Sequence, residues 1–153
     1  MIQRKQTLFL LAAVILTIVC LCLPLGSFTF SNGISTESSA MYNLWISGAD
    51  GSHDFTVWPL FAILLITCTI AITAIFSFRN RITQSRFCMF NVLLLLGWYV
   101  VFAVFAFNSN SDAGKFSASL TAVIPAISII LHFIARRAIL ADEALVRSAD
   151  RIR

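Results

Sequence analysis

The chain has 153 residues, the usual size of one soluble domain, but its composition excludes that class of protein. Hydrophobic residues make up 59% of the chain and charged residues only 12%, whereas an average globular protein is about 25% charged. So few charged side chains cannot cover a soluble fold of this size, and the composition therefore indicates a membrane protein. The net charge of +4 does not indicate nucleic-acid binding, because basic residues also flank membrane helices on their cytoplasmic side.

Four stretches of the chain contain no charged residue and are long enough to cross a bilayer. They cover residues 7–25, 57–78, 87–107 and 117–135. A helix of roughly 20 residues spans the hydrocarbon core, and a helix satisfies its backbone hydrogen bonds internally. Apolar and polar residues do not alternate here, which argues against a β-barrel. The sequence therefore predicts an all-α integral membrane protein, one domain folded as a four-helix up-and-down transmembrane bundle.

The basic residues gather on one side of the predicted membrane. With four spans, both termini and the 79–86 loop share a side, and ten of the eleven basic residues lie there, Lys115 being the exception. The positive-inside rule makes this side cytoplasmic, so both termini are expected in the cytoplasm. We expect its charged residues to contact a partner or lipid headgroups: Arg4, Lys5, Arg79, Arg81, Arg86, Glu143, Arg147, Asp150 and Arg151.

The first outer loop, residues 26–56, is the longest connection between the predicted spans. Its short β-prone runs at 28–30 and 42–46 are separated by turn formers and can make a small hairpin. At the outer interface, Trp58 fits the belt of aromatic residues that flanks membrane spans. Tyr42 and Trp45 fit either this belt or a surface for a partner. The second outer loop, residues 108–116, is short.

The tail, residues 136–153, is predicted to continue as a cytoplasmic helix. On a helix, Glu143 and Arg147 lie one turn apart, as do Arg147 and Asp150, so opposite charges can pair. A narrow apolar stripe that includes Leu145 can rest on the membrane surface, on the bundle itself or on a partner.

Small residues within the spans indicate where helices pack closely. Ala118, Ala122 and Ala126 repeat at four-residue spacing in the fourth stretch. Small side chains let helix backbones approach each other, which is how membrane helices associate. Gly97 is expected either to permit the same approach in the third stretch or to make that helix more flexible.

Proline and asparagine carry two further expectations about the spans. Pro125 predicts a kink in the middle of the fourth helix, near Thr121. Asn91 is costly in lipid and should face a neighbouring helix. Trp98 and Tyr99 fall in the middle of the third stretch, so at least one of them should face the interior or a subunit interface.

Few residues in the chain indicate catalysis. None of the four stretches contains Asp, Glu, Lys or Arg, which argues against proton-coupled transport and against most intramembrane catalysis. The four cysteines form no Cys-x-x-Cys motif. His53 beside Asp54 is too little for a metal site, which needs three or four converging ligands. We therefore expect no catalytic residue, no metal and no cofactor.

Three parts of the sequence carry a resemblance to a family: residues 1–7, residues 79–88 followed by Asn91, and residues 142–151. There the chain resembles an uncharacterised family of small four-span inner-membrane proteins of the Bacteroidota, a domain of unknown function. The resemblance implies a multi-pass protein of the bacterial inner (cytoplasmic) membrane. It implies no reaction and transfers no catalytic residue.

The plan of four spans with a long first outer loop also resembles that of claudin-like proteins. The run Asn43-Leu44-Trp45 is similar to a stretch found in that group. The paired loop cysteines of the group are missing here, so this resemblance concerns architecture only.

Two functions remain open on this basis. The first is a non-enzymatic accessory or scaffold subunit of an inner-membrane assembly, whose partners are membrane lipid and other inner-membrane proteins or a second copy, with no nucleic acid. The alternative is a binder or transporter of a small molecule or lipid, acting as a homo-oligomer. Its cleft would be lined by Asn91, Gly97, Thr121, Pro125, Ser128 and His132.

Overall fold

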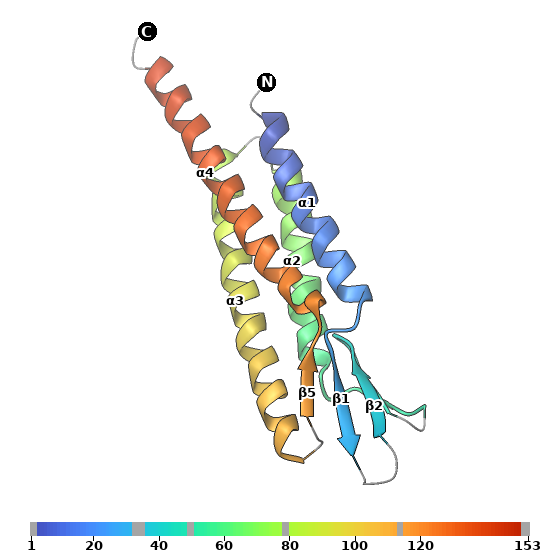
Figure 1. Ribbon diagram of the computed structural model, residues 1–153. Coiled ribbons are helices and arrows are strands. Elements are labelled where there is room, and N and C mark those ends of the chain that lie inside the picture. The colour runs from blue at the N-terminus through green and yellow to red at the C-terminus, as the bar shows by residue number, and fades with distance from the viewer. Residues whose placement is uncertain (1–2, 32–35, 49–50, 78–79, 113–114, 151–153) are drawn as a thin grey trace.

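Four helices run side by side in the part of the chain that the computed structural model describes, residues 3–31, 36–48, 51–77, 80–112 and 115–150 (Figure 1). They are α1 (Gln3–Cys22), α2 (Trp58–Phe76), α3 (Arg81–Asp112) and α4 (Ile124–Asp150), the last preceded by a 3-10 turn, η1 (Leu120–Val123). Helix α1 packs against α2 and α4, and α3 packs against the same two helices.

A five-stranded antiparallel sheet lies at the end of the helices opposite the chain termini (Figure 1). Its strands are β1 (Gly26–Ser31), β2 (Thr36–Met41), β3 (Ile46–Ser47), β4 (His53–Asp54) and β5 (Lys115–Ala118), in the order β4-β3-β2-β1-β5. Strand β5 comes from the connection between α3 and α4, and it pairs with β1 of the first loop. The sheet therefore joins the two connections that were predicted to be separate outer loops.

The prediction of an all-α, four-span bundle is wrong. Besides the sheet, the described residues contain three helical stretches long and apolar enough to cross a membrane, Trp58–Phe76, Arg81–Phe107 and Leu120–Ser148. The apolar part of α1, Gln6–Cys22, is shorter. The predicted first stretch continued past the end of α1, and the predicted fourth stretch began within β5. Both boundaries were misplaced because apolar residues also occur outside the helices. The three long helices identify the chain as a membrane protein.

The start of α4 also differs from the prediction. Pro125 is the second residue of α4 rather than a kink within it, because a helix's first turn does not need the N–H that proline lacks. Ala118 belongs to β5, Ala122 to η1 and Ala126 to the first turn of α4. These three alanines therefore do not form one stripe along a helix.

Gly97 does not bring two helices together either. It lies on the exposed side of α3, and a Cβ added there would meet no atom within 4 Å among the described residues. The close-packing role predicted for it is therefore wrong for this arrangement of the helices.

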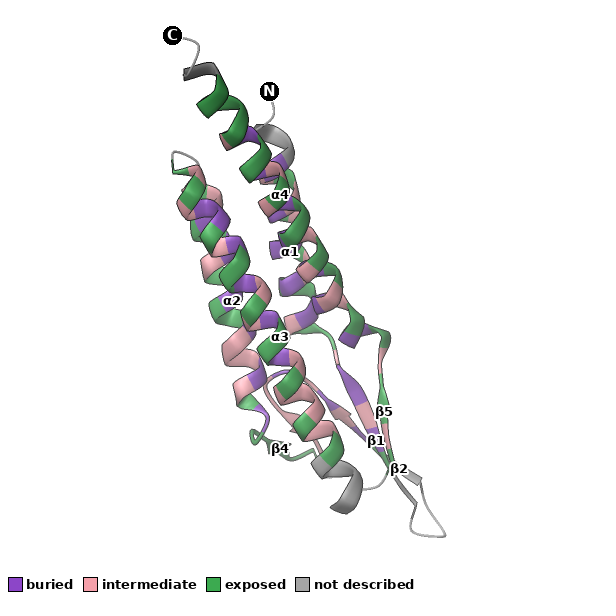
Figure 2. Ribbon diagram, turned by 90° about the vertical axis from the view of Figure 1, so that its left-hand side faces the viewer, coloured by how far each residue is buried: buried purple, intermediate pink, exposed green. Residues whose placement is uncertain are grey.

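Buried residues lie along the inward faces of the helices (Figure 2). Their apolar members form two hydrophobic clusters. The sheet-end cluster consists of Cys20, Leu25, Phe28, Met41, Val57, Leu60, Leu64, Leu95 and Trp98. The terminal-end cluster consists of Leu10, Ala74, Cys88, Ala135 and Ile139. The outward faces carry exposed apolar side chains such as Phe90 and Val100, as expected for contact with lipid.

Candidate functional site

At the terminal end, Arg81 links the start of α3 to α4. Its Nη1 lies 2.9 Å from Oδ2 of Asp142 and donates a hydrogen bond of 3.2 Å to the Asp142 backbone carbonyl. The contact with the carboxylate is an ion pair without hydrogen-bond geometry, since Oδ2 accepts no hydrogen bond from the described residues. Arg81, predicted to contact a partner or lipid headgroups, thus braces the fold in the described structure. No local sequence pattern indicates this pair, because the two residues are 61 positions apart.

Glu143 and Arg147 form the ion pair that their spacing predicted, with 3.2 Å between Arg147 Nε and Glu143 Oε1. Glu143 also lines an open cleft of about 570 Å³ between the start of α3 and the end of α4. The cleft is lined by Asn80, Arg81, Ile82, Thr83, Glu143 and Val146. The structure therefore brings Arg81 and Glu143 together at one site.

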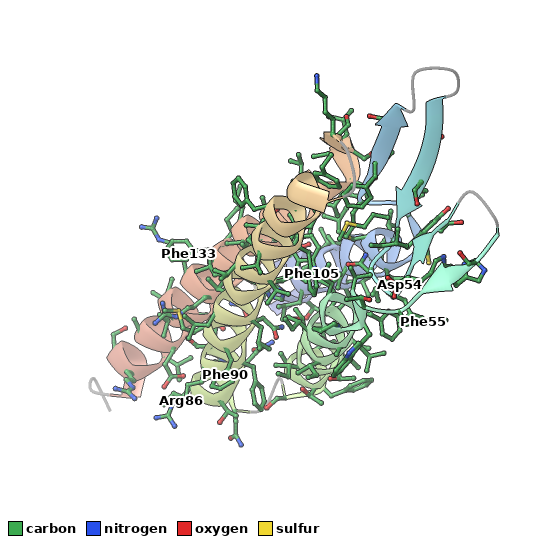
Figure 3. All side chains as sticks on the ribbon, turned by 90° about the horizontal axis from the view of Figure 1, so that it is seen from below. Asp54, Phe55, Arg86, Phe90, Phe105 and Phe133 are labelled. Carbon is green, nitrogen blue, oxygen red and sulfur yellow. The ribbon has the colours of Figure 1, made fainter. Side chains whose placement is uncertain are left out.

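The other predicted inner-face residues are not brought into this cleft. Arg86 is exposed on the outer side of α3, one turn from the exposed Phe90 (Figure 3). Arg4, Lys5 and Asp150 lie within helices, but their side chains are outside the described part of the structure. Arg79 and Arg151 are outside the described residues altogether.

Helix α4 continues beyond its ion pair with Arg81. The segment 143–148 carries exposed Leu145 and Val146, of which Leu145 is 59% exposed. In Figure 1 this end of α4 extends past the start of α1 and the connection between α2 and α3. We call residues 143–148 the projecting segment. It combines an apolar surface with the charges of Glu143 and Arg147.

At the sheet end, the rings of Tyr42, Trp45 and His53 lie in a row, with a tilted contact between the first two and an edge-to-face contact between the last two. The ring centroids are 5.3 Å apart for Tyr42 and Trp45 and 5.5 Å apart for Trp45 and His53. Residues 42–45 form the turn between β2 and β3 rather than a strand, so of the two predicted β-prone runs only 28–30 lies within a strand. Trp58 is exposed at the first residue of α2.

Asn43, next to this row, is fully buried and closes the end of α1. Its Nδ2 donates a 2.7 Å hydrogen bond to the backbone carbonyl of Cys20. In a continuing helix that carbonyl would accept from residue 24, but Pro24 has no N–H. The asparagine side chain replaces the missing donor and fixes the sheet to α1.

Between the two hydrophobic clusters lie three buried polar side chains, Asn91 on α3 and Ser128 and His132 on α4. All three are 0% exposed. Asn91 Oδ1 and Nδ2, Ser128 Oγ and both ring nitrogens of His132 have no hydrogen-bond partner in the described part of the chain. Asn91 thus faces inward, as predicted. We call these three residues the polar layer.

Two residues predicted to line a cleft with the polar layer are placed differently. Thr121 in η1 and Pro125 in the first turn of α4 are buried on the sheet-end side of Ser128. Next to Thr121, the Ala122 carbonyl accepts a 2.8 Å hydrogen bond from the hydroxyl of Tyr99 on α3. Trp98 is fully buried in the sheet-end cluster, so both aromatic residues contact the interior.

The described residues hold no group of three or more His, Cys, Asp or Glu that could bind a metal ion. Cys20, Cys22, Cys68 and Cys88 are all free thiols.

The chain was compared with models of known protein families. A family model described as Domain of unknown function (DUF4293) matches residues 2–152. The match covers nearly the whole chain, so the protein belongs to this family. A comparison with curated proteins found no match.

Proposed function

We propose that this member of the family is a non-enzymatic accessory or scaffold subunit of a membrane protein assembly. We further propose that it lies in the bacterial inner membrane with both termini in the cytoplasm. The basic residues at the terminal end support this orientation, because cytoplasmic flanks of membrane helices are enriched in Lys and Arg.

The observation that carries the accessory role is the projecting segment of α4. Leu145 and Val146 are exposed there, beyond the ion pair that fixes α4 to α3. Exposed apolar groups on a helix bordered by charges are typical of a surface that another protein covers. The partner we propose is an integral membrane protein whose cytoplasmic side offers an apolar groove bordered by carboxylates, which would face Arg147.

Site-specific photo-crosslinking in cells tests this proposal. A photo-reactive residue at Leu145 should crosslink to a second membrane protein. The matched control is Ile130, which is 58% exposed on the same helix but within the uncharged run 117–135, and it should crosslink to lipid. The substitution Leu145→Glu should abolish co-purification of the same partner in mild detergent. Crosslinking of Leu145 to lipid alone, or to another copy of the chain alone, would overturn the accessory role.

A second candidate function is the binding or transport of a small molecule or lipid by a homo-oligomer. The polar layer favours it, because polar groups buried within membrane helices generally mark functional sites. The side chains of the layer carry hydrogen-bond donors and acceptors but no carboxylate or ammonium group.

A further inference from the structure

The register of α3 and α4 places Asn91 and His132 at one level. The Arg81–Asp142 ion pair aligns the two antiparallel helices (Figure 1). Ten residues further along α3 is Asn91, and ten residues back along α4 is His132. Both are then about 15 Å from the ion pair. Ser128 follows one turn further toward the sheet.

The same level on α1 and α2 carries small side chains. Ala13 on α1 and Ala71 on α2 are buried, yet neither belongs to one of the two hydrophobic clusters. Between the two clusters, the buried residues of α1 and α2 are Ala13, Val14, Thr17, Thr67 and Ala71. All five are smaller than the leucine, isoleucine and tryptophan side chains of the clusters.

The threonine hydroxyls near the level of the polar layer already have hydrogen-bond partners. Thr17 donates to the Ala13 carbonyl and Thr67 donates to the Ile63 carbonyl, each at 2.8 Å. The side chains of Asn91, Ser128 and His132 make no such bond to the described residues. A buried polar group without a hydrogen bond is costly in any apolar interior, so these atoms need a partner from outside the chain's own groups.

We infer that the polar layer binds a small polar molecule that both donates and accepts hydrogen bonds. Asn91 and His132 each supply one acceptor atom and at least one donor, and the Ser128 hydroxyl supplies either. No Asp, Glu, Lys or Arg lies between Arg86 and Asp112 or between Lys115 and Arg136. A cation bound in the layer would therefore lack a carboxylate counter-charge on these side chains.

Arg136 marks the terminal-end border of the layer. It lies one turn from His132, and its Nε is buried without a hydrogen-bond partner among the described residues. It adds one more donor for a carbonyl or hydroxyl oxygen of the ligand. A ligand that donates and accepts these hydrogen bonds can be a group of water molecules or a small polar organic compound.

This inference rests on the second candidate function, and its test separates the two sources of ligand. The full chain is reconstituted in lipid nanodiscs without added ligand and analysed in two ways. Native mass spectrometry detects an organic molecule that stays bound. Solid-state NMR of the labelled His132 ring detects magnetisation transfer from water.

We expect wild-type protein to show either a bound organic molecule or water transfer to His132. Asn91→Leu and Ser128→Ala should each lower that signal about tenfold, because each removes a hydrogen-bonding group from the layer. The matched control Thr67→Val should leave it unchanged, since the Thr67 hydroxyl bonds its own helix. If Asn91→Leu does not fold, Ser128→Ala gives the same test with a smaller change.

Each outcome is decisive. A bound organic molecule supports the inference and the second candidate function together. Water alone supports the inference but contradicts binding of an organic small molecule. Wild-type protein with neither a bound compound nor water transfer would overturn the inference.

Discussion

Arg81 and Asp142 hold the two longest helices in register, with 2.9 Å between Arg81 Nη1 and Asp142 Oδ2. The same guanidinium nitrogen donates to the Asp142 backbone carbonyl, so the arginine contacts both the backbone of α4 and the carboxylate. The side chains are 22% and 11% exposed, respectively. This one pair fixes the position of α4 relative to α3, and it lies at the base of the projecting segment.

Replacing Arg81 by glutamine should destabilise the protein by about 2 kcal/mol. The change leaves the Asp142 carboxylate mostly buried without its charge partner, which costs more than losing an exposed pair, although less than in a fully buried site. The measurement is thermal or denaturant unfolding in detergent or nanodiscs.

The control for this prediction is Arg147→Gln. Arg147 pairs with Glu143 one turn away, but its side chain is 70% exposed, so its loss should cost no more than about 0.5 kcal/mol. Equal effects of the two substitutions would contradict the bracing role of Arg81.

Asn43→Asp should destabilise the junction between α1 and the sheet. Aspartate has nearly the same shape, but its ionised carboxylate cannot donate to the Cys20 carbonyl, and the two oxygens would repel each other. We expect a loss of at least about 1–3 kcal/mol in unfolding free energy, together with faster hydrogen exchange at the end of α1. The control Ser38→Asp places the same charge on an exposed position of β2. If both variants behave alike, the capping of Cys20 by Asn43 is not what stabilises this junction.

The sequence predicted the helices much better than the sheet. Runs of uncharged apolar residues are local, and they located the cores of α2 and α3 within a few residues. The pairing of Gly26 with Ala118 joins residues from two different connections. Hydropathy contains no information about such a pairing, and Phe116 and Ala118 are as apolar as helix residues. The predicted fourth span therefore began inside β5.

The sequence predicted the chemical preference of single residues better than it predicted which residues lie together. It indicated that Asn91 must face inward, because an exposed amide in lipid is costly. It could not show that Asn91 and His132 share a level, since their alignment depends on a pair of residues, Arg81 and Asp142, distant from them in sequence. The spacing of Glu143 and Arg147 was sufficient for their ion pair because that interaction is contained within one helix turn.

Replacing a glycine by alanine is expected to change the stability in opposite directions at Gly26 and at Gly97. A Cβ at Gly26 would lie 2.6 Å from the Phe116 ring and 2.7 Å from the Ser117 carbonyl oxygen. Gly26→Ala should therefore separate β1 from β5 and cost about 1–3 kcal/mol.

Gly97→Ala should instead stabilise α3 by about 0.5–1 kcal/mol, because alanine loses less backbone entropy in a helix and meets no neighbouring atom. Unfolding measurements on both variants check the pair of predictions. A loss of stability in Gly97→Ala would show that this face of α3 is covered by something other than lipid, such as a second subunit.

The proposed orientation predicts which end of the molecule a membrane-impermeant thiol reagent can reach in intact cells. In a variant whose four cysteines are replaced by alanine, single cysteines are introduced at Ser38 on β2 and at Ser148 near the end of α4, both exposed positions. Ser38→Cys should be labelled in intact cells, because the sheet would face the periplasm. Ser148→Cys should be labelled only after the cells are opened, because basic residues hold that end in the cytoplasm. The reverse pattern would place the terminal end outside and would remove the support for a cytoplasmic partner at Leu145. Labelling of both positions in intact cells would mean that the sheet and the projecting segment lie on the same side of the membrane.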